Sequence, residues 1–386
     1  MKILTALTYY RPHISGLTIY TERLAKALVK RGHEVTVLTS QYDPATPREE
    51  VDQGVRIIRV PVLLRVSKGV IMPTLGFTAT ELVRENEVVH LHLPQFDAAG
   101  IALRGRLQKK PTILTYHCDL KLPPGLFNKM ANYAVQVMNH LAAISAHRIV
   151  TYTPDYAQNS PYTKRYSNKV ETILPPVDLP YSSQEAITTF ASLNNLDSRS
   201  PVIGMASRFA SEKGVEILLD ALPRILESHP DAMVLYAGQY EDVLGEEEYA
   251  QRLFSIIKKY QARGQWKFVG VLSPNEMASF YPNLDVLVVP SINSTESFGL
   301  VQIEAMMNGV PVVASDLPGV RQPVRITGMG RIFPVGDSQG LASALISLFE
   351  QPSKYESDQD EVARKFTSDV AAEAYEDLYR RIKSEL

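Results

Sequence analysis

The sequence lacks the features of a secreted or membrane-spanning protein. Its single cysteine, Cys118, excludes an intrachain disulfide framework and is typical of a reducing compartment. No uncharged apolar run approaches the ~18 residues that a spanning helix needs. The first residues, MKILTALTYYRP, have neither the apolar core nor the cleavage site of a signal peptide. We therefore expect a cytoplasmic protein, with peripheral contact at the cytoplasmic membrane face left open.

A strong excess of one charge is also absent. The 40 Lys and Arg residues nearly balance the 42 Asp and Glu residues, for a formal net charge of −2. No global basic field attracts nucleic acid, and we expect no nucleic-acid partner. Basic residues do gather at 104–110 (RGRLQKK), which suits a solvated helix end or anionic head groups. With 45% hydrophobic residues, the chain is long enough for two globular domains.

The chain opens with a strand, a loop and a helix but without a dinucleotide-binding motif. Residues 2–8 predict the strand, 9–18 the loop and 19–31 the helix. The loop holds one glycine, Gly16, and no G-x-G-x-x-G, which disfavours a dehydrogenase. Strands and helices alternate further along, and this order predicts an α/β protein with Rossmann-like, doubly wound sheets.

The most informative stretch is 291–315, SINSTESFGLVQIEAMMNGVPVVAS. It follows an apolar run, 284–290, and ends in a second one, 310–314, and both predict buried strands. Between them the pattern predicts a helix over 298–308 that Gly309 ends.

Two carboxylates and three backbone N–H groups around this predicted helix are suited to binding a sugar nucleotide. Glu296 lies just before it, and Glu304 falls on an apolar face, where a carboxylate needs a hydrogen-bond donor. The free backbone N–H groups of Phe298, Gly299 and Leu300 suit a phosphate. Carboxylates that bind diols, next to an anion-binding helix end, indicate a nucleotide-sugar pocket. The alternative is a helix with acidic residues at its favoured end and a structural ion pair.

A second cluster follows the strand predicted over 202–206. In SRFASEKG, Arg208 and Lys213 lie between a strand end and a helix start. A lysine there faces the positive end of the helix dipole and costs about 0.3–1 kcal/mol. This cost is understandable if an anion binds at this position. The alternative is that Arg208 and Lys213 are solvated surface charges.

These motifs resemble a known family. The E-x7-E spacing of Glu296 and Glu304, continued by EAMMNGVPVVAS, and the R-x4-K-G segment are similar to the retaining glycosyltransferases of family 4. Their GT-B fold has two Rossmann-like domains that face a central cleft. The resemblance implies that Glu304 holds the ribose diol, that Glu296 holds the donor-sugar hydroxyls, and that Arg208 and Lys213 neutralise the diphosphate.

The resemblance also implies roles for residues outside these two motifs. Gly16 would approach the donor phosphates, although Ser15 replaces the second glycine that the family usually has. His117, at the carboxyl end of a strand over 111–116, would meet the donor sugar from the first domain. Val269 and Leu272, in KFVGVL, would read the nucleobase through their backbone. Asp119 is placed to orient the imidazole or to contact an acceptor hydroxyl.

Departures from the family limit what can be transferred. Pro318, Gly319 and Gln322 stand where members commonly have two glycines and a glutamate, so the donor sugar is not assigned. Tyr240 replaces a frequent glycine. The acidic run 241–248 (EDVLGEEE) predicts a solvated loop and helix start.

Domain boundaries follow from the proline-rich segment 175–182, which predicts a linker. We expect a first domain over 1–175, a second over 182–364 and a terminal helix at about 365–386 that returns to the first. The resemblance implies that the first domain binds the acceptor and the second the nucleotide sugar. A helix predicted over 128–146 has an apolar stripe that we expect to face the core.

The resulting expectation is a retaining hexosyltransferase that uses a nucleoside-diphosphate sugar. UDP-sugars are favoured and GDP-sugars come next. We expect no resident cofactor and no metal, because the one D-x-D triplet, 358–360, lies in a polar segment. His90 and His92 share a strand face and suit the core or a pocket better than a metal.

Other functions remain open. A nucleotide-sugar-binding regulator, an inactive partner subunit or a nucleotide-sugar epimerase would each use a similar donor pocket. The acceptor is a glycan or a lipid-linked sugar, and the apolar segments 60–66 and 69–77 would suit a lipid as well as an ordinary core and surface. The sequence does not give the oligomeric state.

Overall fold

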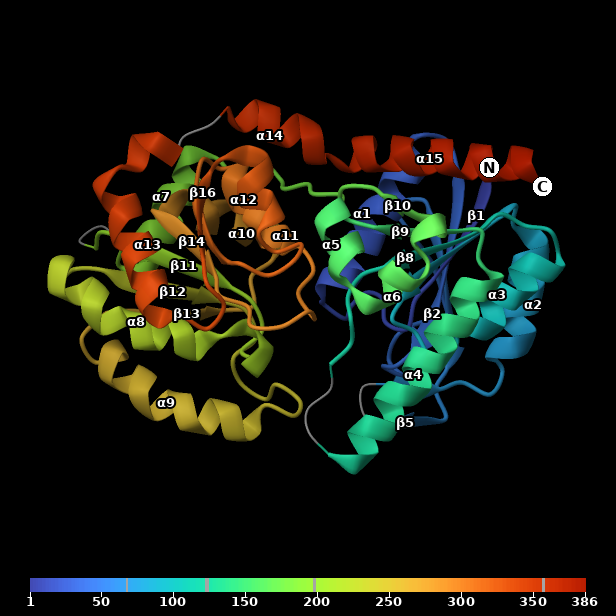
Figure 1. Cartoon of the computed structure of the whole chain (residues 1–386), viewed down its shortest axis with the longest axis horizontal. Helices are drawn as coiled ribbons and strands as arrows, with labels where there is room; N and C mark the ends of the chain where they lie inside the picture. Colours follow the sequence, from blue (N-terminus) through green and yellow to red (C-terminus); the bar gives the residue numbers. More distant parts are fainter. Residues whose placement is uncertain (67–68, 122–124, 197–198, 356–357) are drawn as a thin grey trace. The chain divides into compact units, whose positions relative to one another are not determined.

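The computed structural model describes residues 1–386 except 67–68, 122–124, 197–198 and 356–357. The chain forms two compact units (Figure 1). Unit 1 comprises Met1–Pro176 and Phe366–Leu386, and unit 2 comprises Val177–Lys365. The last residues of the chain therefore belong to the same unit as the first.

Unit 1 is built on an eight-stranded sheet with the order β10-β9-β8-β7-β1-β2-β4-β3. All neighbours are parallel except β3 and β4. The strands are β1 (Lys2–Ala6), β2 (Glu34–Gln41), β3 (Glu49–Asp52), β4 (Val55–Pro61), β7 (Val88–Leu93), β8 (Thr112–Tyr116), β9 (Arg148–Thr151) and β10 (Val170–Thr172). The central strands β7 and β8 are buried along their whole length, because helices cover both faces of a parallel sheet. A separate hairpin joins β5 (Leu64–Val66) and β6 (Gly69–Ile71).

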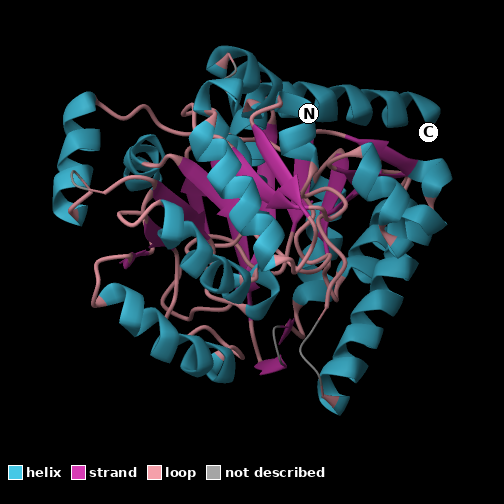
Figure 2. Cartoon of the chain, turned by 60° about the vertical axis from the view of Figure 1, so that its left-hand side comes forward, coloured by secondary structure: helices cyan, strands magenta, loops and turns pink. Residues whose placement is uncertain are grey.

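Helices surround this sheet (Figure 2). They are α1 (Gly16–Lys30), α2 (Leu75–Glu85), α3 (Ala98–Leu107), α4 (Leu126–Ser145), α5 (Pro154–Asn159), α6 (Pro161–Arg165), the short 3₁₀ turn η1 (Ser167–Lys169) and α15 (Ser368–Glu385). The last of these, α15, packs against α1. Arg31 at the end of α1 bonds Glu376 of α15 at 2.9 Å.

Unit 2 contains a six-stranded, wholly parallel sheet with the order β13-β12-β11-β14-β15-β16. The strands are β11 (Val202–Ala206), β12 (Met233–Ala237), β13 (Trp266–Gly270), β14 (Val286–Val289), β15 (Val312–Ser315) and β16 (Gly330–Phe333). Successive strands run outward from β11 to one edge and from β14 to the other. The strand order thus reverses between β11 and β14, and open parallel sheets bind ligands beyond the carboxyl ends of the strands at such a point.

The helices of unit 2 complete its two outer layers. They are α7 (Gln184–Asn194), α8 (Val215–Ser228), α9 (Glu247–Gln261), α10 (Pro274–Phe280), α11 (Leu300–Met306), α12 (Gln322–Thr327), α13 (Ser338–Glu350) and α14 (Gln359–Phe366), with the 3₁₀ turns η2 (Ser211–Lys213), η3 (Tyr281–Asn283) and η4 (Pro352–Tyr355). The prediction of Rossmann-like, doubly wound α/β sheets is confirmed in both units.

Several predicted boundaries are wrong for local reasons. Helix α1 begins at Gly16 and not at 19, because the Ser15 hydroxyl caps it by accepting the Thr18 N–H at 3.2 Å. The terminal helix is two helices that meet at Thr367, which caps α15. The segment 328–337 (GMGRIFPVGD) favours a closing loop, but it contains strand β16.

The expectation for the helix over 128–146 is also wrong in one respect. Helix α4 forms, but its apolar stripe does not face the core: Leu126, Met130 and Tyr133 are exposed. Its buried side carries small and polar residues, among them Ala142 and Asn139.

Candidate functional site

Two loops meet at the point where the strand order of unit 2 reverses. The loop after β11 carries Arg208 and Lys213, and the loop after β14 carries Glu296. A backbone bond from Ile292 N–H to the Glu212 carbonyl, 3.0 Å long, ties them together. A side chain on Gly214 (φ +68°) would put its Cβ 2.1 Å from the carbonyl oxygen of Pro290. Glycine is required there because the two backbones approach so closely.

Lys213 and Glu296 form an ion pair where the strand order reverses. The Lys213 Nζ lies 2.6 Å from a Glu296 carboxylate oxygen, and the two side chains are 19% and 20% exposed. The lysine does lie between strand end and helix start, as predicted, and Glu296 supplies an anion beside it. Arg208 pairs instead with Glu212, at 3.0 Å, and keeps 43% of its side chain exposed.

The loop after β11 is anchored by the start of α9. Buried Glu246 accepts the Ser211 backbone N–H at 2.9 Å. Tyr249 accepts the Val215 N–H at 3.1 Å and donates to Glu216. The prediction of a solvated acidic run at 241–248 is therefore wrong at Glu246, which fixes the turn η2 that ends in Lys213.

The second glutamate of the E-x7-E motif is buried and hydrogen-bonded. The Glu304 side chain lies on α11, and the Tyr281 hydroxyl donates to its Oε2 at 2.6 Å. This is the kind of donor that the sequence required for a carboxylate on an apolar face. Tyr281 belongs to η3, 23 residues earlier in the chain, so helical spacing could not reveal it.

The turn that leads into α11 differs from the prediction. The helix spans Leu300–Met306, so Phe298 and Gly299 precede it, and Gly299 is its N-cap in a left-handed conformation (φ +78°). Gln302 braces the turn, since its amide donates to the Phe298 carbonyl at 2.6 Å and to the Val320 carbonyl at 2.9 Å. Gly309 ends the segment with φ +76°, as the sequence suggested.

The residues expected to read a nucleobase lie at the carboxyl end of β13. Val269 is in the strand, which ends at Gly270, and Leu272 is in the turn before α10. The Gly238 N–H bonds the Gly270 carbonyl at 2.7 Å and holds the neighbouring strand end alongside. Tyr240 stacks on Phe268 with ring centroids 4.2 Å apart, so an aromatic pair flanks this strand end.

In unit 1, His117 directly follows β8 and is buried. Its Nε2 lies 2.9 Å from Nδ1 of His92, and its Nδ1 contacts the Tyr152 hydroxyl. The Tyr20 ring packs edge-on against it at 4.9 Å. Burial lowers the pKa of His117 to about 3, so the imidazole is neutral near pH 7.

Two consequences follow for the roles predicted in unit 1. Both ring nitrogens of His117 are engaged, so a sugar hydroxyl would have to replace one of these contacts. The proposed orienting role of Asp119 is wrong: its carboxylate accepts from Tyr116 at 2.9 Å and from Ser160 at 2.7 Å. The residues that orient the imidazole are His92 and Tyr152.

Helix α15 extends this buried polar cluster. The Tyr375 hydroxyl lies 2.7 Å from both Tyr20 and Thr115, and Tyr379 lies 2.7 Å from His90. His90 and His92 are fully buried, as the core interpretation predicted. Within the described residues, no group of three or more His, Cys, Asp or Glu side chains could hold a metal ion.

The remaining predicted positions have local explanations. Gly16 is in the first turn of α1, and an added Cβ would have nothing within 4 Å, so the structure offers open space there. Asp358 of the D-x-D triplet accepts the Asp360 and Glu361 N–H groups at the start of α14. These bonds account for an acidic residue at that position without a metal.

A cavity of about 240 Å³ lies in unit 1 between α2, α3 and α4. Its lining is mostly apolar, with Phe96 and Met138 among the contributors, and it includes Asp97 and Arg104. Asp97 follows β7 and precedes α3 but makes no capping bond to it. Burial raises the pKa of Asp97 to about 6.

Comparisons with known proteins agree with this architecture. The family model "Glycosyl transferases group 1" matches residues 188–366, and "Glycosyl transferase 4-like domain" matches 15–172. The chain is 25% identical over 374 residues to the phosphatidyl-myo-inositol mannosyltransferase of Mycobacterium leprae, covering 95% of this chain and 93% of that protein. It is 27% identical over 346 residues to a glycosyltransferase of Methanocaldococcus jannaschii, covering 84% and 83%.

Solved structures are similar over the whole chain. Sucrose-phosphate synthase from Thermosynechococcus elongatus has a TM-score of 0.77 at 21% identity and covers 100% of both chains. Anabaena HepE in complex with UDP-glucose also has a TM-score of 0.77, at 19% identity and with 100% of both chains covered. These likenesses define the fold.

Two Rossmann-like units, each doubly wound, define the GT-B fold. The chain belongs to the group 1 glycosyltransferases, with a first unit of the family 4 type. Among the described helices, none is long and apolar enough to cross a membrane.

Proposed function

We propose that the protein transfers a hexose, with retention, from a nucleoside-diphosphate sugar to an acceptor hydroxyl. The observation that carries this proposal is the meeting of Lys213 and Glu296 at the strand-order reversal of unit 2, 2.6 Å apart. A cation for the diphosphate and a carboxylate for sugar hydroxyls are thus adjacent at the point where such folds bind ligands. UDP-sugars are the favoured donors and GDP-sugars the next.

The other proposed site residues of unit 2 each bind a different part of the donor. Glu304, held by Tyr281, binds the ribose diol, and the backbone at Phe298, Gly299 and Leu300 receives the diphosphate. The backbone at Val269 and Leu272 contacts the base. These assignments rest on the family motifs together with the burial and bonding of Glu304.

The chemistry follows from the groups present. The bond between the sugar carbon C1 and the diphosphate oxygen breaks, and a bond from C1 to the acceptor oxygen forms on the same face. The acceptor proton passes to the leaving diphosphate. Arg208 and Lys213 stabilise the negative charge that develops on that group, and with these cations in place the proposal needs no metal and no resident cofactor.

Unit 1 is proposed to supply the acceptor side. His117 would contact the donor sugar by exchanging one of its present partners, and Gly16 would leave room for phosphate. The acceptor is a glycan or a lipid-linked sugar. We place the reaction in the cytoplasm, because the single Cys118 suits a reducing compartment.

Saturation-transfer NMR tests the donor assignment. UDP-, GDP- and ADP-sugars would be offered without metal to the wild type and to Lys213→Ala. Selective binding of one base that the variant loses supports the proposal, and the anomeric configuration of the product then tests retention. Binding without any turnover would favour a regulator or an inactive subunit, and turnover of the donor alone would favour an epimerase. Absence of binding to every donor would overturn the proposal.

A further inference from the structure

An apolar stripe runs along the outer face of α4. Its residues are Leu126, Met130, Tyr133, Val137, Leu141 and Ile144. At 100° per residue these six positions fall within about 80° of arc over about 27 Å of helix. Five are exposed, with Leu126 at 78% and Tyr133 at 71%, and Val137 is half-buried.

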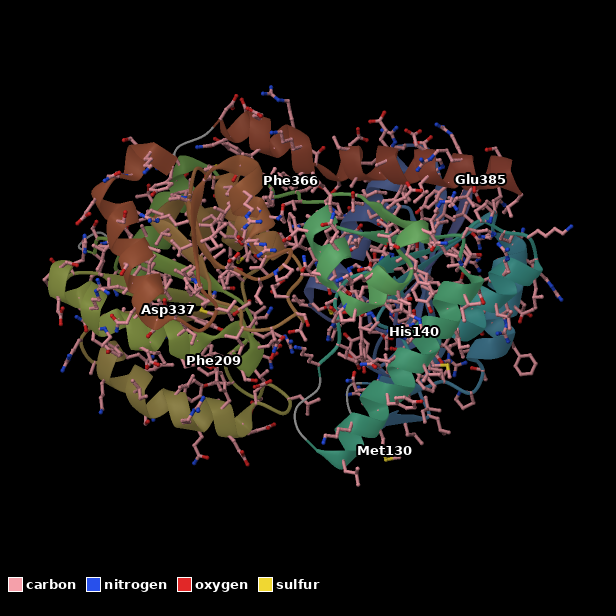
Figure 3. The ribbon with its side chains drawn as sticks, in the orientation of Figure 1. Met130, His140, Phe209, Asp337, Phe366 and Glu385 are labelled. Carbon is pink, nitrogen blue, oxygen red and sulfur yellow. The ribbon has the colours of Figure 1, made fainter. Side chains whose placement is uncertain are left out.

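The opposite side of α4 is the one that packs on unit 1. Ala142, Ala143 and Asn139 are buried there, roughly half a turn away from the stripe. Figure 3 shows Met130 near the outer end of α4, with its side chain pointing away from the ribbon. The stripe is therefore not a core face that has been poorly packed, because α4 already has another face in the core.

The surroundings of the stripe are basic. Residues 97–155 include seven Lys and Arg residues and three acidic residues, Asp97, Asp119 and Asp155, although the whole chain has a net charge of −2. Helix α4 has no acidic residue, and its Lys129 is exposed. The neighbouring helix α3 adds exposed Leu103 and Leu107 and, with the turn after it, exposed Arg106 and Lys109. Exposed apolar residues and local positive charge thus occur on the same two helices.

We propose that α4, with the end of α3, forms a docking surface for an anionic lipid bilayer. A helix that lies in the plane of a membrane buries a narrow apolar face while its cations meet the head groups. A single straight stripe puts all its side chains at one depth, as this geometry requires. The proposal concerns a surface of unit 1 and is independent of the transfer reaction.

A second copy of the chain is the competing occupant, since the spacing of four and three residues also suits a coiled coil. Such a pair would bring two basic surfaces together. Coiled coils balance their flanking charges with acidic residues, and α4 has none to offer Lys129. The charge pattern favours anionic lipid.

The test uses the full chain and vesicles that contain neither donor nor acceptor sugar. Sedimentation with vesicles of phosphatidylcholine alone, or mixed with phosphatidylglycerol, measures binding at low and high salt. We expect binding to the anionic vesicles that weakens with salt. Leu126→Ser combined with Tyr133→Ser is expected to reduce the vesicle affinity about tenfold or more.

A matched control is available in unit 2. Leu193 and Tyr181 are 74% and 93% exposed, so Leu193→Ser with Tyr181→Ser removes the same side chains from another surface. This control is expected to bind vesicles like the wild type. Circular dichroism should show both double variants folded, because all four side chains are exposed.

Three results would overturn the proposal. These are no binding to anionic vesicles, an equal loss in both double variants, and a salt-independent preference for neutral vesicles. Sedimentation velocity adds a separate check: a dimer that only the α4 variant dissociates would show that a second copy covers the stripe. The vesicle assay requires no catalysis, so its result can be interpreted even if the proposed transfer activity is not found.

Discussion

Replacing Glu296 by glutamine should strengthen the binding of UDP while slowing sugar transfer. Lys213 is paired with Glu296, at 2.6 Å. A diphosphate must therefore share this lysine with a carboxylate or displace it, and it must also approach a like charge. Glutamine removes both obstacles but keeps the size of the side chain.

The size of the effect follows from the geometry. Both side chains are about one-fifth exposed, and partly exposed pairs of this kind contribute up to about 1 kcal/mol. A carboxylate about 6 Å from a phosphate charge adds repulsion of about 0.7 kcal/mol at the dielectric constant of water. The sum, about 0.7–1.7 kcal/mol, corresponds to about three- to twentyfold tighter UDP binding. Transfer should fall about tenfold, because the carboxylate no longer holds the sugar hydroxyls.

Isothermal titration calorimetry with UDP at low and high salt measures the first effect, and initial transfer rates measure the second. Glu185→Gln, on the exposed start of α7, controls for the change in net charge. Unchanged or weaker UDP binding in Glu296→Gln would show that Glu296 and the diphosphate do not compete for Lys213. The site assignment in unit 2 would then be wrong.

Three further predictions concern single residues. Lys213→Ala should reduce transfer at least about tenfold and weaken UDP binding while the circular dichroism spectrum is unchanged; normal kinetics would remove it from the site. Tyr281→Phe should raise the Kd of the nucleotide sugar about tenfold, since hydrogen bonds to charged groups contribute about 1.5–3 kcal/mol. Unaltered binding of the nucleotide sugar would show that Glu304 does not need the Tyr281 hydroxyl. Asp97→Asn should stabilise the protein above pH 6, because the raised folded pKa, about 6 against 3.8, means that the charged form is disfavoured in the folded state. This gain, at most about 3 kcal/mol and less with solvent screening, should vanish well below pH 3.8, where both states are protonated, so equal gains in thermal midpoint under the two conditions would contradict it.

The parts of the structure that follow local rules could be predicted from the sequence. Apolar periodicity predicts the doubly wound sheets, and the strand predicted over 202–206 agrees with β11 to the residue. The position of Gly309 at the end of its helical segment was also predictable, because a left-handed residue there strongly favours glycine.

The sequence could not predict hydrogen-bond partners that are distant along the chain and that only folding brings together. Tyr281, which bonds Glu304, and Tyr152, which bonds His117, occur in segments with no distinguishing pattern. The acidic run before α9 has the composition of a solvated loop, yet one of its four glutamates is a buried anchor. The stripe of α4 shows the same limit, since periodicity identifies an apolar face but not whether other residues cover it.

The packing of α15 on unit 1 affects the order in which the two units can fold during synthesis. Tyr375 and Tyr379 bond buried groups of unit 1, yet the ribosome makes all of Val177–Lys365 before it reaches them. At about 5–20 residues per second these 189 residues take about 10–40 s. During that interval Tyr20, His90 and Thr115 have no α15 hydroxyls to bond, whereas unit 2 becomes complete. The unit that emerges first is therefore expected to be the last to reach its native packing, and a released chain that ends near Lys365 should carry a folded unit 2 joined to an unfinished unit 1.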